Sequence, residues 1–198
     1  MAQYEPQKFD QEAVRKVTIL QFLLVAAGIG IGFALHYWLV VRVSGTWVGL
    51  WPIAKSTLAW FWLIPGSILP LLLVYCLFQL VPDLDYLYDE NIRMLADLYS
   101  LSFLVPYFLL NAFMEELIFR GALQASIGFM PTAILFTLVH VSYYKKPLMM
   151  AHVFVMGLII GALFVLTESL WICTLAHACY NWTLMWLIKT DRIAYYRV

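Results

Sequence analysis

Three short polar motifs interrupt apolar stretches in the second half of this 198-residue sequence. An ionisable side chain inside a membrane-spanning segment is costly unless it is paired or faces a cavity, so each motif calls for an explanation. A carboxylate near two imidazoles can deprotonate a water molecule for attack on a carbonyl carbon, and an amide can donate a hydrogen bond to the oxyanion that forms. These residue types therefore favour amide hydrolysis. The motif residues are Glu115, Glu116 and Arg120; Phe136 and His140; and His177 and Asn181.

Helical spacing predicts different roles for the two adjacent glutamates. Glu116 precedes Arg120 by four residues, which is the favoured order for an ion pair on a helix. Glu115 points about 100° away from that pair, because a helix turns once in 3.6 residues. We therefore expect Glu115 to be free for chemistry. The same four-residue spacing places both residues of each histidine motif on one helix face.

The three motifs are also predicted to lie at one depth. Glu115 precedes Gly128, where we expect a turn, by 13 residues, and His140 follows it by 12. A rise of 1.5 Å per residue places both about 18 Å from the turn. His177 follows a second connection on the same side, near Thr167, by 10 residues, and so lies about 15 Å from it. One cavity can therefore collect all three.

Composition predicts the elements that hold these residues in place. The chain is 64% hydrophobic and 12% charged, with a mean hydropathy of +0.83, which is typical of a lipid-embedded protein. A bilayer span takes about 20 residues, so about six spans would use nearly the whole chain. We expect an all-α, polytopic transmembrane helix bundle that forms a single integral membrane domain over residues 1–198. The predicted spans are 17–41, 57–81, 99–122, 129–144, 147–166 and 169–188.

Positive charges predict the orientation. With both termini cytoplasmic, nine Lys and Arg residues lie inside and three lie outside or buried, which is the preferred distribution. The cavity would then be reached from the cytoplasm. The formal net charge is zero and no basic face is present, so nucleic acid is not an expected partner. The inner residues are Lys8, Arg15, Lys16, Arg93, Lys145, Lys146, Lys189, Arg192 and Arg197, and the others are Arg42, Lys55 and Arg120.

The remaining features favour structural roles. The acidic segment Pro82–Asp97 reads as an interfacial helix or loop between two spans, and we assign it no chemistry. Two glycine pairs have the spacing that lets helix backbones approach closely. Cysteines within apolar runs usually behave as small hydrophobic residues. The residues concerned are Gly28 with Gly32, Gly157 with Gly161, the cysteines Cys76, Cys173 and Cys179, and the histidines His36 and His152, which match no motif.

The three motifs, in this order, resemble those of the CAAX protease and bacteriocin-processing (Abi) family, which includes the eukaryotic Ras-converting CAAX endopeptidase. The resemblance covers about residues 100–190, which we expect to be the catalytic core, with 1–99 supplying two accessory spans and the acidic connection. It implies an intramembrane glutamic endopeptidase without metal or cofactor, in which Glu115 activates water. The resemblance assigns His140, His177 and Asn181 to the same catalytic site, with Glu116, Arg120 and Phe136 in support.

This chain is shorter than the eukaryotic enzyme. We therefore expect a multi-pass protein of a bacterial cell membrane that contacts lipid and cleaves a peptide, or a protein with a membrane-associated segment or terminal anchor.

Three other readings stay open. Glu115, His140 and His177 could supply three zinc ligands of a metal-dependent protease, although the chain lacks a His-Glu-x-x-His helix. The protein could instead be a non-catalytic scaffold or bacteriocin-immunity member of the same family, which binds a partner helix near Gly28 and Gly157. A transporter is the weakest reading, because the sequence shows no repeated halves.

Overall fold

The computed structural model describes residues 10–51, 53–54, 56–81, 87, 89–190 and 192–193. Every regular element in this part of the chain is a helix, which confirms the all-α class. Predictions that involve Lys8, Lys55, Pro82, Asp83, Asp85 or Arg197 concern positions outside it. The elements are α1 Gln11–His36, η1 Tyr37–Val41, α2 Arg42–Ser44, η2 Thr57–Trp62, α3 Leu63–Leu80, α4 Glu90–Leu98, α5 Leu101–Glu116, η4 Leu117–Gln124, α6 Ala125–Ile127, α7 Phe129–Leu138, η5 Val141–Tyr143, α8 Pro147–Thr167 and α9 Leu170–Lys189.

Each of the six predicted spans contains a helix, but the helices differ in length. Four continuous helical segments of the described chain are long and apolar enough to cross a membrane: Gln11–Ser44, Thr57–Leu80, Leu101–Ile127 and Pro147–Thr167. These segments define an integral membrane protein. The short apolar helix α7 has 10 residues, or about 15 Å at 1.5 Å per residue, roughly half of a bilayer core. The total of six spans therefore stays a prediction.

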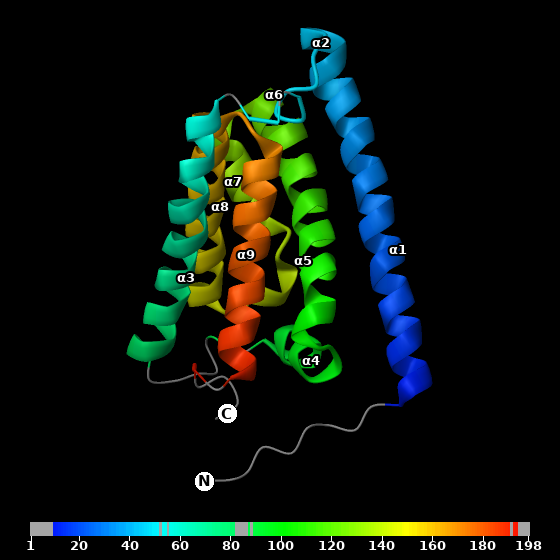
Figure 1. The fold of residues 1–198 in the computed structure, drawn as a ribbon, viewed down its shortest axis with the longest axis vertical. Helices are drawn as coiled ribbons and strands as arrows, with labels where there is room; N and C mark the ends of the chain where they lie inside the picture. The colour runs from blue at the N-terminus through cyan, green and yellow to red at the C-terminus, as the bar shows by residue number, and fades with distance from the viewer. Residues whose placement is uncertain are drawn as a thin grey trace.

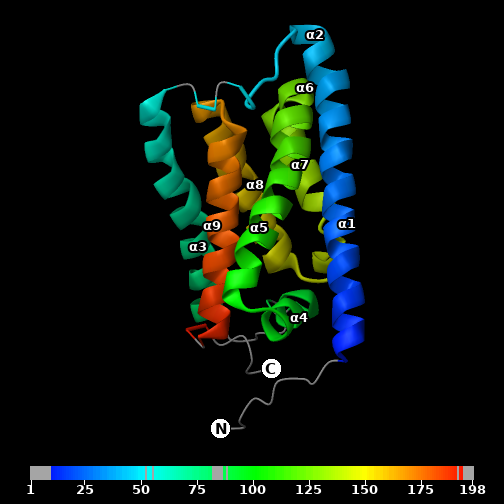
Figure 2. The ribbon, with the colours of Figure 1, turned by 45° about the vertical axis from the view of Figure 1, so that its right-hand side comes forward.

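The helices form one bundle with α9 at its centre. α9 packs against α3, α5 and α8, α7 packs against α8, and α1 packs against α5 and η4. Figures 1 and 2 show α1 and α3 on opposite sides of α9. Exposed leucines lie on both outer helices, such as Leu23 on α1 with 62% and Leu72 on α3 with 52% exposure. Apolar surface of this kind suits contact with lipid.

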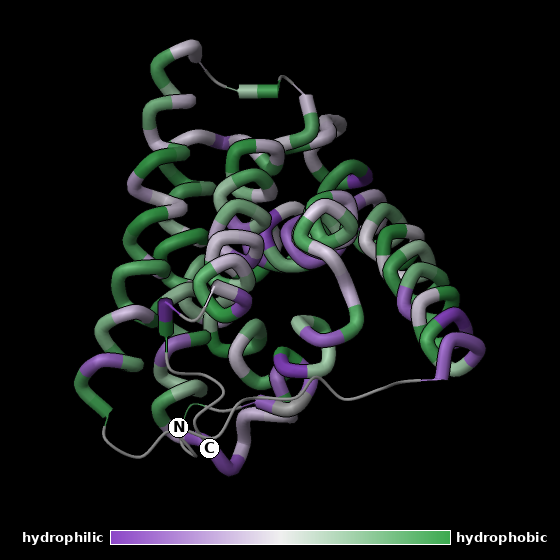
Figure 3. Tube along the Cα trace, turned by 60° about the horizontal axis from the view of Figure 1, so that its bottom comes forward, coloured by the Kyte–Doolittle hydropathy of each residue, from purple (hydrophilic) through white to green (hydrophobic). Residues whose placement is uncertain are grey.

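The two ends of the bundle differ in polarity and in their connections. The start of α1, the end of α9 and all of α4 lie at one end, which is at the bottom of Figure 1. Figure 3 views this end and shows hydrophilic residues at the start of α1 and inside the bundle, with mainly apolar outer turns. The opposite end carries the predicted turn at Gly128, whose φ of 89° suits glycine. The assignment of the first end to the cytoplasm stays a prediction.

Local side-chain contacts explain where the helices around the site begin. The hydroxyl of Ser100 accepts a hydrogen bond of 3.3 Å from the backbone N–H of Phe103, and that of Ser169 accepts one of 3.2 Å from Ile172. Asp89 caps α4 in the same way through its carboxylate. Such caps satisfy N–H groups that a helix leaves unpaired in its first turn. The sequence therefore fixes the first turns of α4, α5 and α9 locally.

Helix α4 forms most of the described part of the acidic connection, and it lies across the end of the bundle (Figures 1 and 2). The ammonium group of Lys189, in the last turn of α9, donates hydrogen bonds to the carbonyl oxygens of Ala96 and Tyr99. The Tyr99 hydroxyl in turn lies 2.7 Å from the Thr18 hydroxyl on α1. Three segments that are distant in the sequence are therefore joined beside α4.

Both glycine pairs lie at close helix contacts, as predicted. A Cβ atom on Gly161 would lie 2.7 Å from the Phe129 ring, and one on Gly157 would lie 3.2 Å from the Phe136 ring. On α1, a Cβ atom on Gly32 would lie 3.0 Å from Leu117. These faces pack within the chain, which is the structural role predicted for them, and nothing here supports the alternative reading in which they bind a partner helix.

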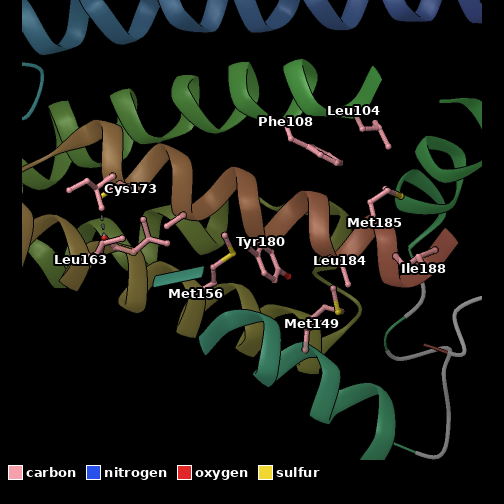
Figure 4. Packing of buried hydrophobic residues seen from close by; sticks show 14 of the residues in the cluster. Leu104, Phe108, Met149, Met156, Leu163, Cys173, Tyr180, Leu184, Met185 and Ile188 are labelled. Atoms are coloured by element: carbon pink, nitrogen blue, oxygen red, sulfur yellow. Dashed lines mark hydrogen bonds between the residues drawn. The ribbon is translucent and has the colours of Figure 1, made fainter. Parts of the chain in front are cut away.

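The apolar core surrounds α9. Phe108 from α5, Met149 and Met156 from α8, and Leu184 and Met185 from α9 are all buried in one cluster. Figure 4 shows these side chains extending into the space between the three helices. The three cysteines of the chain are free thiols. This core forms one wall of the polar site described next.

Candidate active site

The Glu-Glu-Arg motif lies where the helix changes from α to π form. α5 ends at Glu116, and the continuous helix goes on as the π-helical segment η4. Nε of Arg120 lies 3.2 Å from Oε2 of Glu116, and both side chains are almost fully buried. The guanidinium lies 4.7 Å from the Phe136 ring centre and donates to the carbonyl of Gly157 at 3.4 Å. The predicted ion pair is therefore present, and it also ties η4 to α7 and α8.

Glu116 has a second partner that the sequence did not predict. Oε1 of Glu116 lies 2.8 Å from Nδ1 of His177, on the central helix α9. A carboxylate can only accept, so Nδ1 of His177 is the donor. In the neutral imidazole the lone pair is then on Nε2. Glu116 thus joins Arg120 to His177 and sets the orientation of the His177 ring.

Glu115 lies outside the ion pair, as predicted, but its carboxylate is not free of partners. Nδ2 of Asn111, one helical turn earlier, donates a hydrogen bond of 2.8 Å to Oε1 of Glu115. The other oxygen, Oε2, lies 3.9 Å from Nε2 of His177. The side chain of Glu115 retains 20% exposure, whereas that of Glu116 has none. Of the two glutamates, Glu115 is therefore the one that a small molecule can reach.

His140 does not continue helix α7, so the predicted extension of this span to residue 144 is wrong. α7 ends at Leu138, and His140 has a ψ of 60°. Its backbone N–H turns to the carbonyl of Thr137, and Nδ1 of its imidazole lies 2.7 Å from the carbonyl oxygen of Phe136. In a continuing helix, the backbone N–H of His140 would donate to the carbonyl oxygen of Phe136. Here the imidazole of His140 takes the place of that donor. Since a carbonyl only accepts, Nδ1 of His140 carries a proton, and in the neutral imidazole Nε2 holds the lone pair.

A partly open cavity of about 180 Å³ collects the predicted site residues. The side chains of Glu115, His140, His177 and Asn181 all line it, together with Phe136. Glu116 and Arg120 do not line it and lie behind His177 as its buried support. The structure therefore brings the three motifs together at one place, and their catalytic roles stay predictions. Among the described residues that line this cavity there is no Lys or Arg.

Five further polar residues of the described cavity wall fall outside the motifs, and one of them is Tyr107 on α5. His152 on α8 and Tyr180 on α9 form a buried hydrogen bond of 2.7 Å between Nε2 and the hydroxyl. The ring of Tyr143 stacks on that of His140 with centres 6.0 Å apart, and Asn111 bonds to Glu115 as described. Only Asn111 carries a sequence signal, because it lies four residues before a motif glutamate.

The other histidine outside the motifs has a structural environment. His36 is completely buried and stacks on Trp47 with ring centres 5.3 Å apart. It lies against Gly121 of η4, where a Cβ atom would be 2.9 Å from its Nδ1. His36 therefore packs α1 against η4, away from the cavity.

A second, more open pocket approaches the same two motif residues from another direction. It is lined by Glu115 and His140 together with apolar side chains. Glu115 and His140 therefore belong to both pockets. Within the described part of the chain, no group of three or more His, Cys, Asp or Glu side chains is arranged to hold a metal ion. The apolar residues of the second pocket are Met114, Ile118, Phe119 and Val139.

The fold and the site define an integral membrane protein whose helices surround a cavity lined by a carboxylate, three imidazoles and two side-chain amides. Residues 97–183 match the family described as type II CAAX prenyl endopeptidase Rce1-like. The resemblance to the CAAX protease family is thus confirmed over this part of the chain. The chain is also 26% identical to the uncharacterized protein YpbD of Bacillus subtilis (strain 168) over 130 residues, 65% of this chain and 67% of that protein. No solved structure matches the chain. The family supports a peptidase that acts on a peptide substrate in a membrane.

Proposed function

We propose that the protein is an intramembrane glutamic endopeptidase in which Glu115 activates a water molecule that attacks a peptide bond. The observation that carries the proposal is the 3.9 Å distance between Oε2 of Glu115 and Nε2 of His177 in the cavity. Two atoms at this distance can both hydrogen-bond to one water molecule at about 2.8 Å. A carboxylate and an imidazole that share a water form the general-base arrangement that amide hydrolysis needs.

Each step of the reaction has a group in the cavity to perform it. Glu115 takes a proton from water while the water oxygen bonds to the carbonyl carbon, and the carbonyl oxygen becomes an oxyanion. The amide of Asn181 and the Nε2–H of a protonated His140 are the donors for this oxyanion. Glu115 then gives the proton to the leaving nitrogen as the carbon–nitrogen bond breaks. The products are a free carboxyl and a free amine.

The substrate that fits this site is a membrane-associated peptide segment, such as a leader peptide or a terminal anchor. Apolar atoms form most of the cavity surface, and the second pocket adds an apolar approach to Glu115 and His140. We place the catalytic core at residues 100–190 and the accessory part at 1–99, in a bacterial cell membrane with both termini in the cytoplasm.

The test is cleavage of a fluorogenic peptide library by the purified protein in lipid or detergent. Glu115→Gln should lower kcat/KM by about 10²- to 10⁴-fold, the range for loss of a general base. The matched control is Glu12→Gln, because Glu12 is an exposed glutamate that pairs with Lys16 far from the cavity. Each variant is assayed with and without a chelator.

Different outcomes would point to different functions. Cleavage that needs Glu115 and resists the chelator supports the proposal. Loss of cleavage with the chelator would indicate a metal-dependent protease, and activity retained in Glu115→Gln would overturn the role of Glu115. A folded wild type that cleaves no peptide would favour a non-catalytic family member.

A further inference from the structure

Asn111 is a polar residue on the cavity wall that belongs to none of the three motifs. It lies in an apolar part of α5, where an amide side chain needs a hydrogen-bond partner. That partner is Glu115, through the 2.8 Å bond from Nδ2 to Oε1. Asn111 also lines the cavity together with Glu115. Its single described side-chain bond is therefore made to the carboxylate that we propose as the base.

This bond distinguishes the two oxygens of Glu115. Oε1 accepts from Asn111, while Oε2 is the oxygen recorded 3.9 Å from Nε2 of His177. An amide N–H can only donate a hydrogen bond. It therefore bonds well to a carboxylate oxygen or to the carbonyl oxygen of a protonated acid, but it cannot accept the proton of the acid's O–H group. With Nδ2 of Asn111 donating to Oε1, the added proton of a protonated Glu115 is favoured on Oε2.

The other groups around Glu115 do not fix it in this way. His177 on α9 lies at 3.9 Å, beyond hydrogen-bond length. His140, Tyr107 and Tyr143 line the same cavity. Among the described residues, the bond from Asn111 is the one hydrogen bond that Glu115 accepts. Without it, the carboxylate could rotate about its last torsion, which has no sharply preferred angle.

We propose that Asn111 is a positioning residue that holds Oε1 of Glu115, so that Oε2 takes the proton of water and later delivers it to the leaving nitrogen. This inference rests on the proposed function. Asn111 bonds to Oε1 in both protonation states of Glu115, so the side chain keeps one orientation through the cycle. The proton then moves only between water, Oε2 and the leaving group, which conserves atoms and charge.

The experiment compares Asn111→Leu with Asn111→Gln on a peptide that the wild type cleaves. Leucine keeps the branching at Cγ and the number of non-hydrogen atoms and suits an apolar helix but removes the donor, whereas glutamine keeps an amide donor. The control is Leu110→Ala, at a neighbouring position of α5 with 40% exposure. Asn111→Leu should lower kcat by about 10- to 100-fold, as loss of an orienting partner does, with KM changed less than about twofold. Asn111→Gln should recover at least part of kcat.

Three outcomes would overturn the inference: a wild-type kcat in Asn111→Leu, a change confined to KM, or equal losses in the leucine and glutamine variants. Glu115→Gln is measured in the same series. If Glu115→Gln stays active, the proposed function fails. If Glu115→Gln is inactive while Asn111→Leu is fully active, only the role of Asn111 fails. If Asn111 had only a structural role, Asn111→Leu would lower the yield of folded protein, and the folded fraction would not show a lower kcat at a nearly unchanged KM.

Discussion

Nδ1 of His177 donates a hydrogen bond of 2.8 Å to Oε1 of Glu116, which lies 61 positions earlier in the chain. The bond joins the central helix α9 to the end of α5 and is completely buried. Because a carboxylate only accepts, the bond selects the tautomer that presents Nε2 to the cavity. Three tests of stability and one of catalysis follow from this arrangement and from the packing around it.

Glu116→Gln should reduce catalysis although residue 116 does not line the cavity. The amide removes the negative charge that orients His177 and can turn its NH2 group toward Nδ1. We expect kcat to fall by about 10- to 100-fold, the range for loss of the carboxylate that orients a metal-binding histidine. Steady-state kinetics per mole of folded protein measure this, with Glu12→Gln as the control. A wild-type kcat would show that Glu116 serves only Arg120.

Arg120→Met should destabilise the protein, because Glu116 would lose its buried cation. Removing one member of a buried pair typically lowers the free energy of unfolding by about 3–5 kcal/mol. Thermal unfolding in detergent measures the loss. The double variant Arg120→Met with Glu116→Gln leaves no unpaired charge, so its loss should be smaller than the sum of the two single losses. Additive losses would contradict a direct interaction between the two side chains.

Gly161→Ala should also destabilise the bundle. The new Cβ would lie 2.7 Å from the Phe129 ring and 3.0 Å from Oε1 of Gln124, a residue whose amide donates to the Gly161 carbonyl at 2.8 Å. Overpacking of this kind lowers stability by about 1–3 kcal/mol. The control is Gly30→Ala on α1, where a Cβ meets nothing within 4 Å. Equal unfolding temperatures for the two variants would show that α8 can move away from α7 without loss.

Tyr180→Phe should lower stability because it removes the hydroxyl that bonds to Nε2 of His152. Nδ1 of His152 is already buried without a recorded partner, so the imidazole would lose its one described hydrogen bond. A buried group left unpaired destabilises by about 1–3 kcal/mol. Tyr75→Phe, at a position of α3 with 40% exposure, is the control. Replacing both His152 and Tyr180 by Phe should restore part of the loss, and a larger loss in the double variant would argue against a simple interhelical bond.

The sequence by itself determined the class of fold, the helical segments and the identities of the motif residues. Apolar runs of span length need no distant contact to be helical, since a helix satisfies its backbone hydrogen bonds within the segment. The pair of Glu116 and Arg120 was equally predictable, because residues four apart on a helix are neighbours. The common depth of Glu115, His140 and His177 followed from the rise per residue and the positions of the turns.

Only the tertiary structure decided which atoms meet across helices. Depth along an axis does not fix how far each helix is rotated about it, so His177 could have faced either Glu115 or Glu116. In the structure it contacts Glu116 through Nδ1 and approaches Glu115 through Nε2. The early end of α7 at Leu138 likewise depends on an imidazole taking the place of a backbone donor. Such contacts arise from helix rotation and side-chain rotamers, which packing of the whole bundle sets and local spacing does not.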